Sequence, residues 1–238
     1  GPHKAGGDTL PAPPLKNYNA MAQNLFNQVR TPAALLAGVT FGAIFGMPLV
    51  VGDPFLLAVL KRGYVILLGA ALGCQLLSIV AATAGLMKLA VEADTPGHAY
   101  ASPVAQLRAE LPLEWAACTF NFCAGLLLFT VAVGIRAHIS IACPYASKVV
   151  VFMFSGAFLA MFQFVNTNSR ELTGTNGFVP LAWDYVKQMA VSGSVLNLAA
   201  LGCMLLSVVW TVLTVHHFAP PLAQWMPGAV AATPVKPV

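Results

Sequence analysis

The chain has 238 residues, of which 58 % are hydrophobic and only 8 % are charged, and its mean hydropathy is +0.76. Soluble domains carry about 25 % charged residues, so this composition excludes a soluble protein and indicates an integral membrane protein. The formal net charge of +4 is small and scattered along the chain, which argues against a nucleic-acid-binding protein with a dense basic face.

The first 30 residues are predicted to form an extended arm followed by an interfacial helix. Residues 1–16 are rich in proline and glycine, which favours the arm. The chain begins at Gly1, which fits a processed mature form or a residue left by expression. In residues 17–30 apolar side chains recur at helical spacing, with asparagine, glutamine and arginine on the other face. This segment is too polar to span a bilayer, so we expect a helix lying on the membrane or docked on a partner subunit.

Residues 31–51 are predicted to form the first transmembrane helix. The stretch carries no charge and is long enough to cross a bilayer core of about 30 Å. Thr31 followed by Pro32 is a typical helix start. Small residues recur at every fourth position and form one nearly bare stripe: Ala34, Gly38, Gly42 and Gly46. In lipid such a stripe favours close packing against another helix, and a pore-lining helix is the alternative.

Four further spans follow in the sequence, and polar connections separate them. They are predicted at residues 63–89, 113–135, 148–165 and 195–218. Short helices are expected in the connections, at residues 103–111 and 182–189. The second and third spans contain more small residues that we expect to pack against neighbouring helices: Gly69, Gly73, Ala117 and Gly125. The tail from residue 219 is rich in proline and alanine.

The predicted fold is therefore an all-α, polytopic membrane helix bundle. It has about five transmembrane helices, preceded by an N-terminal interfacial amphipathic helix. Three parts are expected: an arm and interfacial helix at residues 1–30, the transmembrane bundle at residues 31–218 and a Pro-rich tail at residues 219–238.

Enzymatic and pumping functions are disfavoured by what the spans contain. No span has a central Asp, Glu, Lys or Arg, which argues against a proton pump, a secondary transporter or a voltage sensor. The sequence has no HExxH, P-loop or GxSxG motif, so we expect no catalytic residues and no enzyme. The five cysteines form no CxxC pair, so neither a disulfide framework nor a metal site is predicted.

A few nitrogen- and oxygen-bearing side chains near or within the spans can serve as axial ligands of a tetrapyrrole metal. In order of preference these are His138, His216, Gln75 and Asn121. Histidines at the membrane interface are more commonly anchors without a ligand, and that reading stays open. The expected cofactors, if any, are chlorophyll and carotenoid at peripheral sites, because paired glutamate and arginine residues of the light-harvesting type are absent from the spans.

Two segments resemble a known channel family. RTPAALLAGVTFGAIFG and LEWAACTFNFCAGLLLF are similar to the first and third helices of the Orai calcium channels. The resemblance implies a first helix that lines a pore, with Leu35 and Gly38 facing it. It places the family's selectivity carboxylate at Gly46 and its basic inner-pore position at Thr31. Glycine cannot supply the ring of carboxylates that gathers Ca²⁺, so calcium selectivity is not expected.

The sequence as a whole favours a non-catalytic accessory subunit of a large organelle energy-transducing membrane complex. A photosystem supercomplex of the plastid thylakoid is preferred to a complex of the mitochondrial inner membrane, on the general character of the chain. The expected roles are assembly, antenna docking and peripheral pigment binding, and the expected partners are other membrane subunits and the lipid bilayer. An Orai-like ion channel or a small-solute transport protein is the alternative.

Overall fold

The structure, a computed structural model, describes residues 18–47, 54–91, 100–141, 143–173 and 177–218. Seven helices make up almost all of this part of the chain: α1 (Asn19–Ile44), α2 (Phe55–Val91), α3 (Pro103–Glu110), α4 (Pro112–Ser140), α5 (Pro144–Thr173), α6 (Phe178–Val191) and α7 (Val195–Phe218). The prediction of an all-α fold is confirmed. The predicted arm at residues 1–16 and the tail at 219–238 lie outside the described residues.

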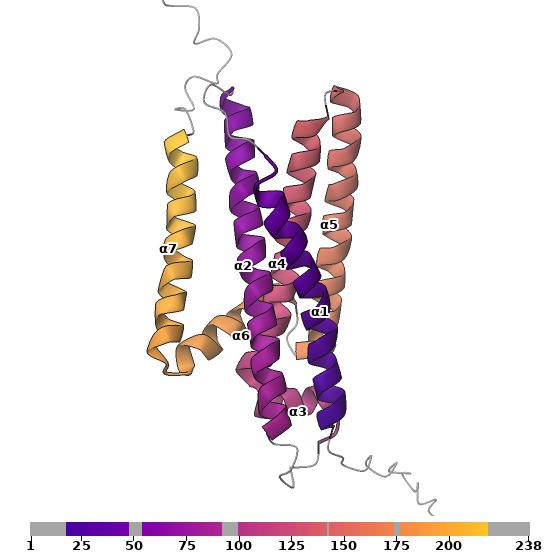
Figure 1. Ribbon diagram of the computed structural model, residues 1–238, viewed down its shortest axis with the longest axis vertical. Coiled ribbons are helices and arrows are strands. Elements are labelled where there is room, and N and C mark those ends of the chain that lie inside the picture. The colour runs from indigo at the N-terminus through magenta and orange to yellow at the C-terminus, as the bar shows by residue number, and fades with distance from the viewer. Residues whose placement is uncertain (1–17, 48–53, 92–99, 142, 174–176, 219–238) are drawn as a thin grey trace, which may run out of the picture.

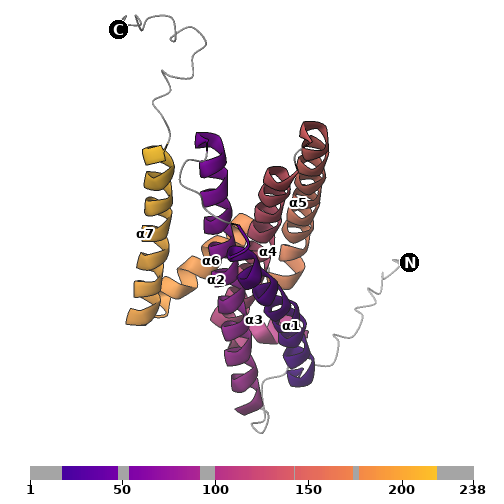
Figure 2. The same ribbon diagram turned by 45° about the horizontal axis from the view of Figure 1, so that its top comes forward.

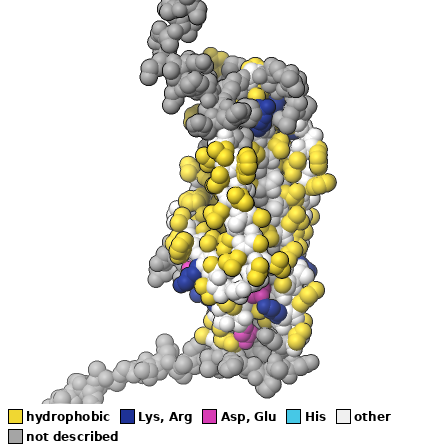
Figure 3. Space-filling model, turned by 90° about the vertical axis from the view of Figure 1, so that its left-hand side faces the viewer, with side chains coloured by type: hydrophobic (Ala, Val, Ile, Leu, Met, Phe, Trp, Pro, Cys, Tyr) yellow, Lys and Arg dark blue, Asp and Glu magenta, His cyan; other side chains and the backbone are white. Residues whose placement is uncertain are grey.

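Within the described residues, four helices are long and apolar enough to cross a membrane: α2, α4, α5 and α7. Figure 3 shows hydrophobic side chains over the middle of one face, with lysine and arginine near its upper end and charges of both signs towards its lower end. This distribution supports the prediction of an integral membrane protein. The predicted count of five spans is not confirmed, because α1 is not among the four.

The first helix differs from its prediction at both ends. Pro32 lies inside α1, so the predicted interfacial helix and the predicted start of the first span belong to one continuous helix. That helix ends at Ile44, and the apolar part from Thr31 onward covers only about 21 Å at ~1.5 Å per residue. Residues 48–51 of the predicted span lie outside the described residues.

Tertiary packing explains why the Thr31–Pro32 start signal fails. The buried residues of α1 continue along one face on both sides of the proline: Ala22, Phe26, Ala33, Ala37 and Thr40. The amino-terminal half of α1 packs inside this chain, where the ring of Phe26 contacts that of Trp115 edge-on, with centroids 5.6 Å apart. One uninterrupted buried face outweighs the loss of one backbone hydrogen bond at proline.

The centre of the bundle is the contact of α2 with α4, and α1 leans across both (Figure 1). Glycine allows the closest approaches. A Cβ atom at Gly125 would lie 2.4 Å from Gln75 Nε2 and 3.1 Å from the carbonyl oxygen of Ala71. A Cβ atom at Gly85 would lie 2.5 Å from Cζ of Phe26. These two positions fix the spacing of α2 from α4 and from α1 respectively.

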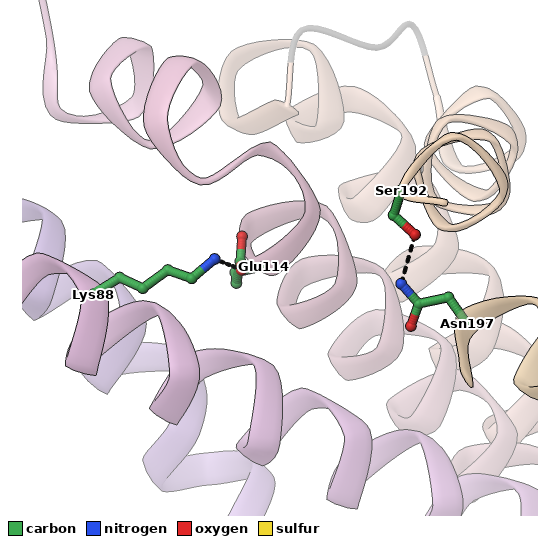
Figure 4. Close-up of polar contacts among 4 residues, drawn as sticks. All are labelled: Lys88, Glu114, Ser192 and Asn197. Carbon is green, nitrogen blue, oxygen red and sulfur yellow. Dashed lines mark hydrogen bonds and ion pairs between the residues drawn. The ribbon is translucent and has the colours of Figure 1, made fainter. Parts of the chain in front are cut away.

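Polar contacts tie the helices together at the end where α2 ends and α4 begins. Lys88 forms an ion pair with Glu114, as Figure 4 shows. The side chain of Gln106 accepts a hydrogen bond from the backbone N–H of Tyr18 at 3.1 Å and donates one to Glu110 at 3.0 Å. The short helix α3 thereby closes this end of the bundle over the start of α1.

Aromatic rings attach α6 to the bundle. Phe120 of α4 stacks on Phe178 and lies against Tyr185, with centroid separations of 5.4 and 5.2 Å. Phe162 of α5 meets the same Phe178 ring at 6.0 Å. The predicted short helix at residues 182–189 is thus the centre of a longer helix that packs against both α4 and α5.

The last helix stands away from the rest of the bundle, as both ribbon views show (Figures 1 and 2). Residues 195–213 of α7 include no buried residue. A sharp turn after α6 sets its direction. Gly193 adopts a positive φ of 66°, and Asn197 donates a hydrogen bond of 2.7 Å to Ser192 Oγ across the turn (Figure 4). The predicted bounds of this span, 195–218, match α7.

Candidate functional site

The predicted packing stripe on α1 faces away from this chain. All four stripe residues, Ala34, Gly38, Gly42 and Gly46, are exposed. A Cβ atom at Gly38 or Gly42 would meet no atom within 4 Å. At Gly38 and Gly42 the stripe therefore makes no close contact within the described part of the chain, and the face of α1 that packs is the one carrying Ala33 and Ala37.

The other predicted packing positions divide between inner and outer faces. Gly69 and Gly73 on α2 also have open space around them. Ala117 is half-buried on α4, and Gly125 forms the tight contact described above. Sequence reasoning missed Gly85, which lies near the end of α2 and packs closely against the ring of Phe26.

An apolar groove of about 520 Å³ runs between α4 and α5, with the start of α2 at its edge. Its lining includes Leu60, Gly134, Ile135, His138, Phe154 and Phe158. Val131, Val151 and Leu159 also line it and are exposed, so the groove opens towards lipid. Its volume falls in the range of about 300–1,000 Å³ that is usual for small-molecule sites.

A hydrogen-bonded pair lies at the end of this groove, where α4 turns into α5. His138 Nδ1 hydrogen-bonds Ser147 Oγ. The Ser147 hydroxyl also donates to the backbone carbonyl oxygen of His138 at 3.3 Å. Either the ring or the hydroxyl can be the donor in the Nδ1–Oγ contact. In the tautomer whose Nδ1–H donates to Oγ, Nε2 carries a free lone pair. Sequence reasoning identified His138 but not Ser147.

The remaining predicted ligands lie elsewhere. Gln75 and Asn121 are fully buried at the contact of α2 with α4, and neither lines the groove. Asn121 donates a hydrogen bond of 2.8 Å to the carbonyl oxygen of Ala117. The side chain of His216 lies outside the described residues, although its backbone belongs to α7. The structure therefore brings neither Gln75 nor Asn121 to His138.

A cation lies beside the position that the Orai resemblance gives to the selectivity carboxylate. A Cβ atom at Gly46 would stand 3.3 Å from Nη1 of Arg136. The same guanidinium lies over the ring of Tyr64, 5.8 Å from its centroid, and the Tyr64 hydroxyl donates to the carbonyl oxygen of Ala43 at 2.9 Å. Arg136 thus places positive charge where a calcium filter requires negative charge.

We expect Cys143, in the turn between α4 and α5, to react as an accessible thiol. Two backbone N–H groups, from Ala146 and Tyr145, hydrogen-bond its sulfur and lower the pKa of the Cys143 thiol below its ordinary value. The thiolate therefore persists to lower pH, and its alkylation by iodoacetamide should reach half its maximal rate at a lower pH than N-acetylcysteine does. The rate against pH is the measurement, with Cys143→Ser as the blank.

The same thiol reports whether the α4–α5 turn meets water. A membrane-impermeant maleimide should label Cys143 from one side of sealed vesicles, while Cys203 within the α7 span stays unlabelled. Failure to label Cys143 even in opened vesicles would place the turn inside the bilayer and contradict the arrangement of spans.

Comparison with known proteins finds no match among protein-family models, curated proteins or solved structures.

Proposed function

We propose that this chain is a non-catalytic accessory subunit of a large organelle energy-transducing membrane complex. The observation that carries the proposal is α7, a transmembrane helix without a buried residue between positions 195 and 213. Helices in membranes associate through close packing and interhelical hydrogen bonds, and α7 obtains little of either from its own chain. A helix of this kind is suited to packing between helices of other subunits.

The exposed stripe on α1 supports the same proposal. Small residues let backbones approach closely, and the open space at Gly38 and Gly42 leaves room for a helix from another chain. The open glycines of α2, Gly69 and Gly73, offer a second surface of this type. The expected partners are therefore other membrane-spanning subunits, with lipid covering the rest of the surface.

Within this class we favour a photosystem supercomplex of the plastid thylakoid over a complex of the mitochondrial inner membrane. The preference rests on the general character of the chain, and the groove with His138 is compatible with a peripheral pigment such as chlorophyll. Carotenoid at the exposed apolar faces belongs to the same proposal. Assembly and antenna docking are the proposed roles, and no catalytic residue is assigned.

The stoichiometry of the native assembly tests this function. After mild solubilisation and purification of the complex that contains the chain, an accessory subunit should occur once beside unlike chains. A symmetric assembly of identical copies would contradict the proposal.

An Orai-like channel is the second candidate, because the exposed face of α1 also suits a ring of identical chains around an axis. Leu35 is 70 % exposed, and Gly38 lies on the same outer face. Such a ring would bring the arginine beside each Gly46 towards the path.

We therefore expect the full chain, reconstituted in liposomes, to pass no Ca²⁺ current. The positive charge of Arg136 would repel cations at a constriction beside Gly46, and glycine at position 46 has no carboxylate to attract them. Fluorescence of a trapped calcium indicator is the measurement. Saturable Ca²⁺ entry, abolished by Leu35→Trp, would refute the accessory-subunit proposal and favour the channel.

A further inference from the structure

The groove between α4 and α5 combines a fixed nitrogen ligand with an apolar, aromatic wall. His138 lines its end nearest the α4–α5 turn, and Phe154 and Phe158 lie one turn apart on α5 along its side. Two other polar side chains, the hydroxyls of Thr130 and Ser155, share the lining. Thr130 is already engaged, since its hydroxyl donates to the carbonyl oxygen of Leu126 at 2.9 Å. Only one strong ligand therefore faces a surface suited to a flat apolar molecule.

The orientation of His138 is what distinguishes this groove from an ordinary lipid-facing cleft. Metal-ligating histidines usually donate their second ring N–H to a fixed acceptor, which sets the tautomer and holds the ring. Ser147 provides that acceptor and is itself buried, with 4 % of its surface exposed. The same hydroxyl lies 3.3 Å from the His138 carbonyl oxygen, to which it can donate. Nε2 has no hydrogen-bond partner among the described residues, and with Nδ1–H donating to Ser147 it is a Lewis base.

The number of ligands restricts the kind of metal. Among the described residues no three His, Cys, Asp or Glu side chains come together, so a bare ion held by several protein ligands does not fit. A metal whose equatorial ligands come from a macrocycle needs only one axial ligand from the protein. Since His138 is the one histidine among the described residues that line the groove, ligation by two histidines on opposite faces does not fit either.

We infer that the groove binds one metallotetrapyrrole, with His138 Nε2 as its axial ligand, Ser147 as the positioning residue and Phe154 and Phe158 against the ring. A magnesium chlorin and a haem with one axial histidine would both use this binding chemistry. The choice of the magnesium chlorin rests on the proposed photosystem function. The substituents of the macrocycle extend into lipid past Val131 and Leu159, which are exposed at the groove.

The test uses the full chain in nanodiscs, titrated separately with chlorophyll a and with haemin. Visible absorption and induced circular dichroism measure binding. We expect saturation at one equivalent with one of the two pigments. The pigment that saturates shows whether the groove binds a magnesium or an iron tetrapyrrole. His138→Ala should abolish saturable binding, His138→Gln should retain a weaker site, and Ser147→Ala should lower affinity about tenfold or more.

Two further variants separate ligation from folding. The double variant His216→Ala/His217→Ala is the matched control and should bind like the parent chain. Val131→Trp fills the exposed side of the groove while leaving His138 in place, and it should also abolish binding. Circular dichroism in the far ultraviolet confirms that each variant is helical.

Three outcomes overturn the inference. Equal binding by His138→Ala would mean that pigment only partitions into an apolar cleft, which a lipid chain would then occupy. Loss of binding in the His216→Ala/His217→Ala variant alone would move the ligand to α7. Absence of binding by the parent chain would remove the site but leave the accessory-subunit function standing, because the stoichiometry of the complex tests that function without pigment.

Discussion

Replacing Gly125 with leucine is expected to cause the largest loss of stability in this chain. Even one added carbon would lie 2.4 Å from Gln75 Nε2 and 3.1 Å from the carbonyl oxygen of Ala71. The Gln75 side chain can move, but the Ala71 carbonyl belongs to the backbone of α2 and cannot. The two central helices must therefore separate, and overpacking of this kind costs about 1–3 kcal/mol, or more when backbone has to shift.

The measurement is the free energy of unfolding of the detergent-solubilised chain in mixed micelles. Gly156→Leu is the matched control, since a Cβ atom there meets nothing within 4 Å. It should leave the stability unchanged. If Gly125→Leu were as stable as Gly156→Leu, the contact of α2 with α4 would be looser than described, and the positions of Gln75 and Asn121 would need revision.

The second large effect concerns the outer face of α1. Gly38→Leu combined with Gly42→Leu should leave the isolated chain as stable as the parent, because both positions are open within it. Recovery of the chain with its complex should fall at least about tenfold, equivalent to about 1.4 kcal/mol of binding free energy. Two leucines keep a partner helix from approaching the backbone of α1.

Co-purification with the complex, quantified beside the stability of the free chain, checks this prediction. Gly156→Leu again serves as the control, because it adds the same side chain to α5. Normal assembly of the double variant would mean that the stripe faces lipid in the complex. Unfolding of the isolated double variant would mean instead that the stripe packs within the chain.

The sequence predicted well those elements whose limits are set by local chemistry. The bounds of α7 agree at both ends, since a glycine at 193 interrupts the preceding helix and prolines follow position 218. The short helix at residues 103–110 begins, as expected, at a proline, and Ser102 caps it by accepting from the backbone N–H of Ala105 at 3.1 Å. Both signals act within a few residues of the helix end.

The sequence failed where distant contacts decide the structure. The start signal at Thr31–Pro32 is overruled by packing of Phe26 against Trp115, residues far apart in the chain. Small-residue spacing revealed a bare face on α1 but not its neighbour, because inner and outer faces of a membrane helix are both apolar. For the same reason the sequence does not distinguish Gly125, where an added Cβ atom would collide with α2, from Gly42, where it would meet no described atom within 4 Å.

The candidate site was predictable only in part for the same reason. Histidine after an apolar span identified His138 as a candidate ligand. Its partner Ser147 could not be foreseen, because their contact depends on how α4 turns into α5. Gln75 and Asn121 resembled ligands in the sequence, yet their burial depends on the register of α2 against α4.

The separation of α7 from the bundle has a consequence for how the chain is made. A helix that gains little from its own neighbours is held in the bilayer chiefly by partition into lipid. Helices α1 to α6 can then complete their packing while α7 is still leaving the translocation machinery, because residues 195–213 of α7 contribute no buried side chain to the bundle. If the chain is the accessory subunit proposed above, its synthesis and its incorporation are then two separable events, because α7 is still available to a partner after the bundle has packed.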